Sequence, residues 1–363
     1  MGQPIWKGVV FSASLFLSCF FGTLVLLTPL IPVALKWPSV GRRLMDFFLW
    51  LWFVLAAAVY ELFLGVKIVV HGQPAPPKHS VLILCNHRTR LDWLFLMSYE
   101  LRCGTLSQYR ISLKAQLKSI PGPGWAMQCA GFLFLQRDWK KDQDWISQSL
   151  KYFACMGTQP QFLLFPEGTD YCKNGLEKSR KFAEANGLPM YEWVLHPRTT
   201  GFVHFINKMK EYKTLDSVLD VTVAYPKNIV HSEAELGKGT APQEVHFYAQ
   251  NHLISEMPES TDKLEDWLRN TWREKEVALK KFYQVKGFHV NGENSAVSEE
   301  KERSVQRLLW GVVVFWAVFL TVVFYSLIFF PLFKWYCILS ALTFVFIGRS
   351  YGGVDSLLYS LCD

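Results

Sequence analysis

Two long stretches without a charged side chain most constrain how this chain can fold. The first runs from Gly8 to Leu35 and the second from Leu308 to Phe333. Each exceeds the roughly 20 residues that an α-helix needs to cross about 30 Å of hydrocarbon. We therefore expect a transmembrane helix in each stretch. A cleaved signal peptide is the alternative for the first, but the stretch is too long and no small-residue cleavage pattern ends it.

Two shorter apolar runs leave more than one interpretation open. Phe47 to Tyr60 is rich in aromatic residues and is followed by Glu61, and Trp335 to Gly348 has a similar length. Either could be a short span, a re-entrant segment or a helix that lies in the membrane interface. Residues 1–64 and 308–363 are thus expected to be membrane segments.

The charge and the cysteines exclude few classes of function. The formal net charge is +7, but the basic residues are scattered and no basic run has interleaved aromatics, so a nucleic-acid partner is not expected. A protein that faces anionic headgroups explains the charge more simply. The eight cysteines form no CxxC pair, which favours free thiols in a reducing environment.

The region between the membrane segments has the pattern of an α/β domain, expected over residues 65–290 with an exposed linker over 291–307. A helix is expected over Lys263 to Tyr283, with Ser260 or Thr261 as its N-cap. Short β-rich runs alternate with polar stretches of helical length, which predicts a mixed sheet flanked by helices. These runs are VLILC (81–85), GFLFLQ (131–136), FLLF (162–165), DVTVAY (220–225) and VHFYA (245–249).

The stretch NHRTRLD follows the first of these runs and places His87 five positions before Asp92. Five positions along a helix are about 140° off-face, so the two side chains meet only if the chain turns or His87 lies just before the helix start. In that geometry Asp92 orients one imidazole nitrogen, and the other can take a proton from a hydroxyl. A surface histidine with an aspartate that caps a helix is the alternative.

The stretch FPEGTD follows another predicted strand. Its backbone can approach an anion closely at Gly168, with the Glu167 carboxylate and the Thr169 hydroxyl beside it. An ordinary turn after a strand is the alternative, because Pro and Gly suffice for one.

Basic side chains recur near other expected strand ends. Lys114 and Lys118 are four apart on an expected helix, Arg137 ends GFLFLQR, and Arg198 follows a proline in VLHPRTTG. Together they could line one anionic pocket, although each alone is more often a solvated charge.

Two other kinds of site are not favoured. Cys85, His87 and Asp92 lack a second ligand pair at a spacing suited to a metal, so no metal is expected. The sequence holds no GxSxG, which counts against a serine hydrolase.

NHRTRLD, GFLFLQR, FPEGT and VLHPRTTG resemble, in order and spacing, the four blocks of the membrane glycerolipid acyltransferases, the 1-acylglycerol-3-phosphate acyltransferase family. The surrounding stretches IPGPGWAMQ, KFAEANGL and VTVAYP are similar to its lysocardiolipin acyltransferase branch. The resemblance covers nearly the whole chain.

The resemblance implies transfer of a fatty acyl group from acyl-CoA to the free hydroxyl of a lysophospholipid, without a cofactor. His87 would be the general base and Asp92 its partner, so that no nucleophile of the enzyme is needed. Glu167, Gly168 and Thr169 would hold the phosphate of the acceptor, with Lys114 and Arg137 at further basic positions. The family also implies a multi-pass protein of the endoplasmic reticulum membrane, or of the mitochondria-associated membrane.

One residue departs from the family pattern. Most members that form phosphatidic acid have Arg after EGT, where this chain has Asp170. A carboxylate repels a terminal phosphomonoester, so we expect a phosphodiester acceptor such as lysocardiolipin, lysophosphatidylglycerol or lysophosphatidylinositol. The alternatives are a 1-acylglycerol-3-phosphate acyltransferase, a lipid hydrolase or thioesterase, and a lipid-binding membrane scaffold.

The basic residues around the first two apolar runs bear on sidedness. Lys36, Arg42 and Arg43 lie between the runs and Lys7 alone precedes them, which places the connecting loop in the cytosol. A re-entrant second run would then keep the domain with cytosolic acyl-CoA, whereas a full second crossing would place it in the lumen.

Overall fold

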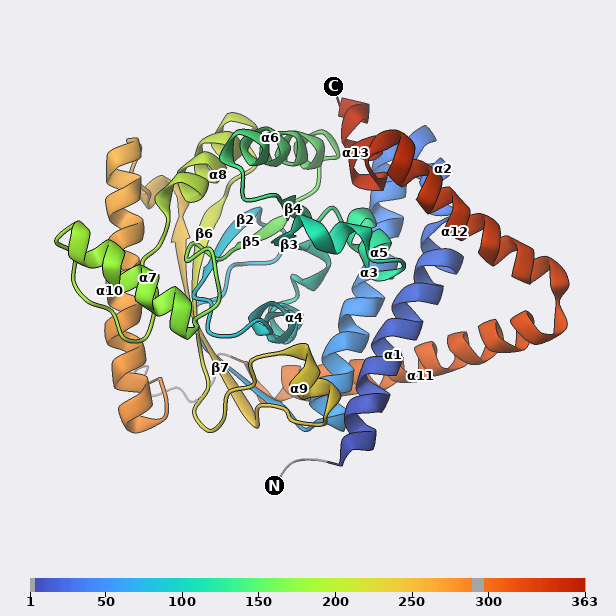
Figure 1. Ribbon diagram of the computed structural model, residues 1–363, viewed down its shortest axis with the longest axis horizontal. Coiled ribbons are helices and arrows are strands. Elements are labelled where there is room, and N and C mark those ends of the chain that lie inside the picture. The colour runs from blue at the N-terminus through green and yellow to red at the C-terminus, as the bar shows by residue number, and fades with distance from the viewer. Residues whose placement is uncertain (1–3, 289–296, 363) are drawn as a thin grey trace.

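The computed structural model describes residues 4–288 and 297–362, which form a seven-stranded mixed sheet with helices on both faces and an apolar helical region at one side (Figure 1). The strands are β1 (Lys67–Gly72), β2 (Val81–Cys85), β3 (Tyr109–Lys114), β4 (Leu133–Leu135), β5 (Gln161–Leu164), β6 (Ser217–Ala224) and β7 (Glu244–Leu253). The expected fold class is confirmed.

The strand order is β1-β7-β6-β2-β5-β3-β4. The middle strand β2 pairs in parallel with β5 and β6, and β3 pairs in parallel with β5 and β4. β7 runs antiparallel to β6 and carries β1 beside it in parallel. Every residue of β2 and β6 is buried, as expected for strands covered on both faces. Because β2, β3, β4, β5 and β6 all run parallel to one another, their carboxyl ends lie at the same edge of the sheet.

Helices cover both faces of the sheet. The helices of this region are α4 (Asp92–Cys103), α5 (Pro123–Cys129), α6 (Trp139–Cys155), α7 (Lys173–Ala185), α8 (Thr199–Glu211), α9 (Glu233–Gly237) and α10 (Thr261–Val285). On one face Phe162 of β5 packs against Phe153 of α6 and Phe205 of α8. On the other face Tyr99 of α4 packs against Phe247 of β7. α4, which begins at Asp92, is thus held against the sheet.

The strands and the long helix match the sequence pattern well. All five β-rich runs form strands, and α10 extends the expected helix by two residues at each end, after Ser260 as N-cap. β1 and β3 were not expected: the apolar run of β1, residues 68–70, is short, and Arg110 interrupts the apolar pattern of β3. In β3 the buried guanidinium of Arg110 bonds Asp46, 64 residues earlier, at 2.6 Å. A partner so distant leaves no local sequence signal.

Four helices in the described part of the chain are long and apolar enough to cross a membrane: Ile5–Leu27, Pro38–Phe63, Glu299–Phe329 and Pro331–Tyr351. The two shorter apolar runs thus belong to helices of full spanning length. The first two spans end in π-helical turns, Thr23–Leu27 and Val59–Phe63. The helical elements are α1 (Ile5–Gly22), α2 (Leu30–Lys36), α3 (Pro38–Ala58), α11 (Glu299–Phe329), α12 (Pro331–Tyr351) and α13 (Val354–Tyr359).

The third apolar helix begins earlier than its apolar run. We expected an exposed linker over 291–307, of which 291–296 lie outside the described residues. Residues 299–307 are helical instead, because the Ser298 side chain accepts a hydrogen bond from the Lys301 amide at the start of α11. Acidic residues at Glu299, Glu300 and Glu302 also suit the positive end of the helix dipole.

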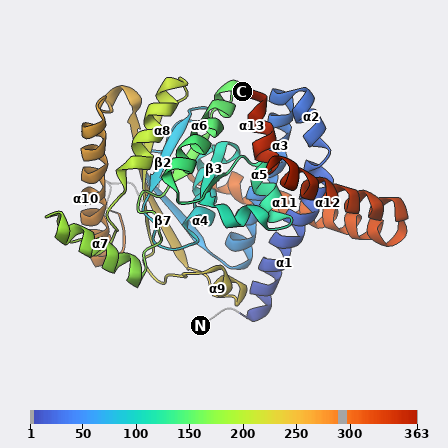
Figure 2. The same cartoon turned by 45° about the horizontal axis from the view of Figure 1, so that its top comes forward.

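α11 and α12 form a hairpin that projects away from the sheet in both views (Figures 1 and 2). Beyond α12 the chain returns to the α/β domain, where α13 packs against α5 and α6. Lys118 binds the buried Asp355 carboxylate at 2.8 Å, and the hydroxyls of Ser149 and Tyr359 are 3.1 Å apart. The last helix is therefore fastened to the domain by polar contacts.

A partly buried ion cluster joins α4, α11 and the π-helical turn after α3. Arg102, near the end of α4, donates to both oxygens of Glu61 at 2.9 Å and to both oxygens of Glu302 at 2.6 and 2.9 Å. Glu61 belongs to the π-helical turn after α3, and Glu302 to the first turns of α11. The side chains of Arg102 and Glu61 are 2% and 4% exposed, so water screens their interaction little.

We expect Arg102→Met to lower the free energy of unfolding by about 3 kcal/mol, because it leaves the buried Glu61 carboxylate without its cation. Arg269→Met is the matched control, since Arg269 also bonds two carboxylates but is 45% exposed. Its loss should cost less than about 1 kcal/mol. Denaturant unfolding of the detergent-solubilised proteins, followed by tryptophan fluorescence, measures both. A loss below about 1 kcal/mol for Arg102→Met, equal to that of the control, would contradict the prediction.

Candidate active site

Three loops meet at the carboxyl edge of the sheet. Residues 86–91 lead from β2 to α4, residues 165–172 lead from β5 to α7, and Tyr225 follows β6. The Asn86 side chain bonds the backbone of Val223 in β6 in both directions, at 2.8 and 3.1 Å. The amide of Tyr171 donates to the carbonyl of His87 at 2.6 Å. These bonds fix the first loop to both neighbours of β2.

His87 and Asp92 are in contact. The Nδ1 atom of His87 lies 3.0 Å from Oδ2 of Asp92. Asp92 is the first residue of α4, and His87 lies outside the helix, which is one of the two arrangements that the spacing allows. Asp92 is fully buried, whereas the His87 side chain is 16% exposed. The aspartate therefore orients the ring, and the ring reaches the surface of the site.

Two further donors hold the Asp92 carboxylate. The amide of Thr89 donates to Oδ2 at 2.9 Å, and the hydroxyl of Tyr225 donates to Oδ1 at 2.6 Å. Burial and the nearby Asp92 charge raise the pKa of Tyr225 well above its usual value, so the phenol stays protonated and can donate. Tyr225 was not among the site residues expected from the sequence. Its position directly after β6, at the carboxyl edge of the sheet, could have indicated a role in the site.

The imidazole of His87 stacks on Phe165, with ring centroids 4.0 Å apart. In the part of the chain that the structure describes, Nε2 has no hydrogen-bond partner. A histidine with Nδ1 bound to a carboxylate and Nε2 free has the arrangement of a general base.

Glu167 lies beneath the same loop. Its Oε1 atom accepts the amide hydrogen of His87 at 3.3 Å and the indole hydrogen of Trp272 at 3.2 Å. Burial raises the pKa of the Glu167 carboxyl to about 7, although the His87 charge lowers it in part. Glu167 is 4% exposed, so it is placed to hold the loop rather than to meet a ligand in water.

Gly168 and Arg198 lie against each other. Gly168 has a φ of +73°, and a β-carbon there would stand 3.3 Å from Nε of Arg198. The Arg198 amide also donates to the carbonyl of Pro166 at 2.8 Å. Glycine thus permits both the turn and the approach of a guanidinium. The loop that we expected to bind an anion, FPEGTD, thus lies against Arg198, a cation 30 residues further along the chain.

The remaining basic positions lie along the same edge but farther away. Lys114 ends β3 and Arg137 follows β4, which are the second and third strands from β2. Since neighbouring strands are about 4.8 Å apart, the ends of β3 and β4 lie roughly 10 and 14 Å from the end of β2. The expected helix that pairs Lys114 with Lys118 is wrong. Lys114 is extended because Ser112–Lys114 pairs with β4, and Lys118 binds Asp355 instead of facing the site.

Arg88 connects the site loop with the second half of the domain. Its guanidinium lies 4.3 Å from the ring centroid of Tyr171 and farther from those of Trp193 and Tyr283, at 5.7 and 5.6 Å. Trp193 and Tyr283 stack on each other with centroids 4.5 Å apart. Cation–π contacts of this kind position the loop, and no sequence pattern predicts them, because the three rings come from distant parts of the chain.

The chemistry that the site offers is proton transfer. Burial raises the pKa of the Cys85 thiol well above its usual value, so it remains a thiol and a poor nucleophile at neutral pH. Within the described residues no group of three or more His, Cys, Asp and Glu side chains could hold a metal ion.

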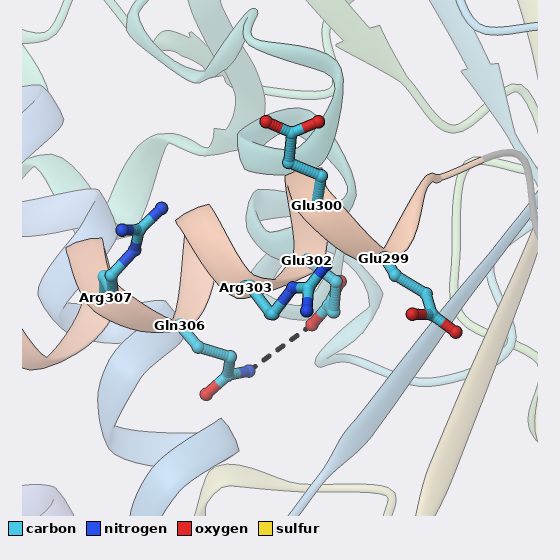
Figure 3. Close-up of a pocket in the computed structure, with 6 residues that line it drawn as sticks. All are labelled: Glu299, Glu300, Glu302, Arg303, Gln306 and Arg307. Atoms are coloured by element: carbon cyan, nitrogen blue, oxygen red, sulfur yellow. Dashed lines mark hydrogen bonds between the residues drawn. The ribbon is translucent and has the colours of Figure 1, made fainter.

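A wide hollow of about 740 Å³ lies elsewhere, along the first turns of α11 (Figure 3). Glutamate, glutamine and arginine side chains of this single helix line it, and the side chain of Gln306 bonds Glu302 at 3.4 Å. It shares no residue with the loops around His87.

Comparison with known proteins gives two family models. Residues 67–226 match the model Acyltransferase, and residues 236–318 match the model Acyltransferase C-terminus. The first match spans the strands and loops that carry the candidate site.

Curated relatives cover nearly the whole chain. Lysocardiolipin acyltransferase 1 of Mus musculus is 39% identical over 96% of this chain and 93% of its own length. Lysophosphatidylinositol acyltransferase 10 of Caenorhabditis elegans is 39% identical over 74% of this chain and 72% of its own. Probable 1-acyl-sn-glycerol-3-phosphate acyltransferase 5 of Arabidopsis thaliana is 32% identical over 74% and 69%.

The raised pKa of Glu167 predicts a pH-dependent stability. The folded protein keeps this proton up to about pH 7, whereas the ordinary value is 4.5, so the folded state binds more protons between these values. Stability of the wild type therefore falls as pH rises through this window. Glu167→Gln removes the penalty and should gain on the order of 2–3 kcal/mol relative to wild type between pH 4.5 and pH 8.

Unfolding in urea at several pH values measures this gain. Glu211→Gln is the control, because Glu211 is 56% exposed on α8. A stability difference between Glu167→Gln and wild type that does not change with pH would contradict the prediction.

Proposed function

Because this chain belongs to the acyltransferase family, we propose that it transfers a fatty acyl group from acyl-CoA to the free hydroxyl of a lysophospholipid, and so remodels phospholipids. The observation that carries the proposal is the contact of His87 with Asp92 at 3.0 Å, with Nε2 free at the edge of the sheet. The relatives named for lysocardiolipin and lysophosphatidylinositol acyltransferases support a lysophospholipid acceptor.

The proposed reaction needs no covalent enzyme intermediate. The acceptor hydroxyl gives its proton to Nε2 of His87 while its oxygen attacks the thioester carbonyl carbon of acyl-CoA. The ester bond forms, the carbon–sulfur bond breaks, and the CoA thiolate takes the proton from the imidazolium. Asp92 stabilises the imidazolium in between, since its buried carboxylate faces Nδ1.

The loops around His87 suggest where the phosphate groups bind. Thr169 and Arg198 offer hydroxyl and guanidinium donors beside the turn at Gly168, which suits the acceptor phosphate. The Gly168 amide donates to the Phe165 carbonyl at 3.0 Å, so glycine serves there by letting a phosphate approach closely. Glu167 would support this loop from below. Lys114 and Arg137 lie farther along the edge, and we assign them to further phosphate groups of the substrates.

Asp170 favours phosphodiester acceptors over lysophosphatidic acid in this proposal. The Arabidopsis thaliana relative is named for 1-acyl-sn-glycerol-3-phosphate, so synthesis of phosphatidic acid is the related alternative. The four apolar helices support a multi-pass membrane protein. We propose the endoplasmic reticulum membrane, or the mitochondria-associated membrane, as its location.

Substitutions in the His87–Asp92 pair test the reaction. His87→Ala and Asp92→Asn should each lower incorporation of radiolabelled oleoyl-CoA into lysophospholipids by roughly 10²- to 10⁴-fold, because general base catalysis is worth about that much. A panel of lysophosphatidylglycerol, lysophosphatidylinositol, lysocardiolipin and lysophosphatidic acid identifies the acceptor class.

His252→Ala and Asp266→Asn serve as controls for these variants. His252 packs on Trp267 and Asp266 is 68% exposed on α10, so neither contacts the loops around His87. Equal incorporation in all five proteins would refute the assigned base. Release of free fatty acid instead of an acylated lipid would identify a hydrolase, and a strong preference for lysophosphatidic acid would refute the phosphodiester assignment.

Tyr225→Phe should lower kcat by roughly 10- to 100-fold with little change in KM, because one hydrogen bond to a charged group is lost. Steady-state kinetics measure the effect. Tyr109→Phe is the matched control: its buried hydroxyl also bonds α4, at the Trp93 carbonyl 3.1 Å away, but does not touch Asp92. If both variants changed kcat equally, the effect would come from α4 packing and not from Asp92.

A further inference from the structure

Two of the loops beside His87 present opposite charges to each other. Arg90 belongs to the loop between β2 and α4, and Asp170 to the loop after β5. Nε of Arg90 lies 3.8 Å from Oδ2 of Asp170. The bond from the Tyr171 amide to the His87 carbonyl, at 2.6 Å, holds the two loops at this separation.

The Arg90–Asp170 side chains lie farther apart than the buried arginine–carboxylate pairs of the molecule. Arg102 approaches Glu302, and Arg110 approaches Asp46, to 2.6 Å. At 3.8 Å the Arg90 and Asp170 side chains attract each other without a hydrogen bond.

Both side chains retain binding capacity. Among the described residues, the other oxygen of Asp170 accepts a hydrogen bond only from the Thr169 hydroxyl, at 3.4 Å. Arg90 makes no hydrogen bond within the described residues. The two side chains are 60% and 24% exposed, so a ligand can reach both.

The mixed charge of this surface favours a singly charged phosphate group over a doubly charged one. Arg90 and Arg198 supply cations near Gly168, and Asp170 places a carboxylate among them. A phosphodiester carries one negative charge, whereas a phosphomonoester carries about 1.5 to 2 at neutral pH. The second charge of a phosphomonoester would meet the Asp170 carboxylate.

We propose that Arg90 and Asp170 recognise the headgroup of the acceptor together. Arg90 donates to the phosphodiester oxygens, and Asp170 accepts a hydrogen bond from a hydroxyl of the headgroup beyond the phosphate. The inference rests on the proposed function and adds its specificity: the acceptor is a lysophospholipid whose phosphodiester bears a hydroxylated headgroup. A carboxylate is useful at position 170 because a hydroxyl needs an acceptor.

Two synthetic acceptors separate the contribution of charge from that of the hydroxyl. Lysophosphatidylglycerol and lysophosphatidylethanol are both phosphodiesters with one negative charge, but only the first has hydroxyls on its headgroup. We expect the wild type to favour lysophosphatidylglycerol in kcat/KM by roughly tenfold or more, the worth of a hydrogen bond to a charged group. Asp170→Ala should bring this ratio to about 1, and Asp170→Asn, which keeps a carbonyl acceptor, should restore part of it.

Arg90→Gln should raise KM for both phosphodiesters by a similar factor and leave kcat nearly unchanged, because it removes binding to the group that they share. Lysophosphatidic acid should gain relative to lysophosphatidylethanol in both Asp170 variants, as the repulsion disappears. Arg269→Gln and Asp266→Ala are matched controls, since these residues form a pair of the same kind, at 3.0 Å on the surface of α10.

The outcomes distinguish this inference from the proposed function. A wild type that acylates lysophosphatidylglycerol, with a ratio that Asp170→Ala does not change, would overturn the headgroup role and leave the reaction standing. A wild type without preference between the two phosphodiesters would overturn it equally. Failure of the wild type to acylate any lysophospholipid would instead refute the proposed function.

Discussion

A carboxylate buried as deeply as Asp92 has lost its water shell, and donors of the protein must replace it. The imidazole of His87 and the amide of Thr89 come from the loop after β2, and the hydroxyl of Tyr225 comes from the end of β6. β2 and β6 pair so that Cys85 stands beside Val221. A shift of this register would move Tyr225 along the edge and leave Asp92 short of a donor. The geometry around His87 is therefore a property of the sheet as much as of the motif.

The sequence predicted those features of the site that depend on residues close together in the chain. Strand periodicity located β2, β5 and β6, and the spacing of His87 and Asp92 limited their contact to two geometries, of which one is found. The rest of the site depends on contacts between distant residues. Tyr225 lies 133 positions from Asp92, and the order β2-β5-β3-β4 determines how far Lys114 lies from the base. Lys118 was misplaced for the same reason, because its partner Asp355 lies near the other end of the chain.

The apolar helices are built into the α/β domain. Half of the most apolar window of Pro38–Phe63 is buried inside the protein, compared with 17% for Glu299–Phe329. The hydroxyl of Tyr60 donates to the Leu94 carbonyl in α4 at 3.1 Å, and Glu61 binds Arg102 at the other end of that helix. Arg42 and Arg110 share the Asp46 carboxylate in the same way. Hydropathy locates such helices but cannot tell which of their faces the domain covers, since polar contacts with distant residues determine this.

The return of α13 to the domain has a mechanical consequence for the hairpin of α11 and α12. Glu302 fastens the start of the hairpin to α4, and Asp355 fastens the chain beyond its end to Lys118, close to α5. A hairpin attached at one end can rotate in any direction, whereas one attached at both ends can rotate only about the line that joins the two attachments. The two ion pairs thereby limit changes in the angle between the hairpin and the edge of the sheet. A bilayer that takes up the hairpin would therefore meet the edge of the sheet that carries His87 over a restricted range of inclinations.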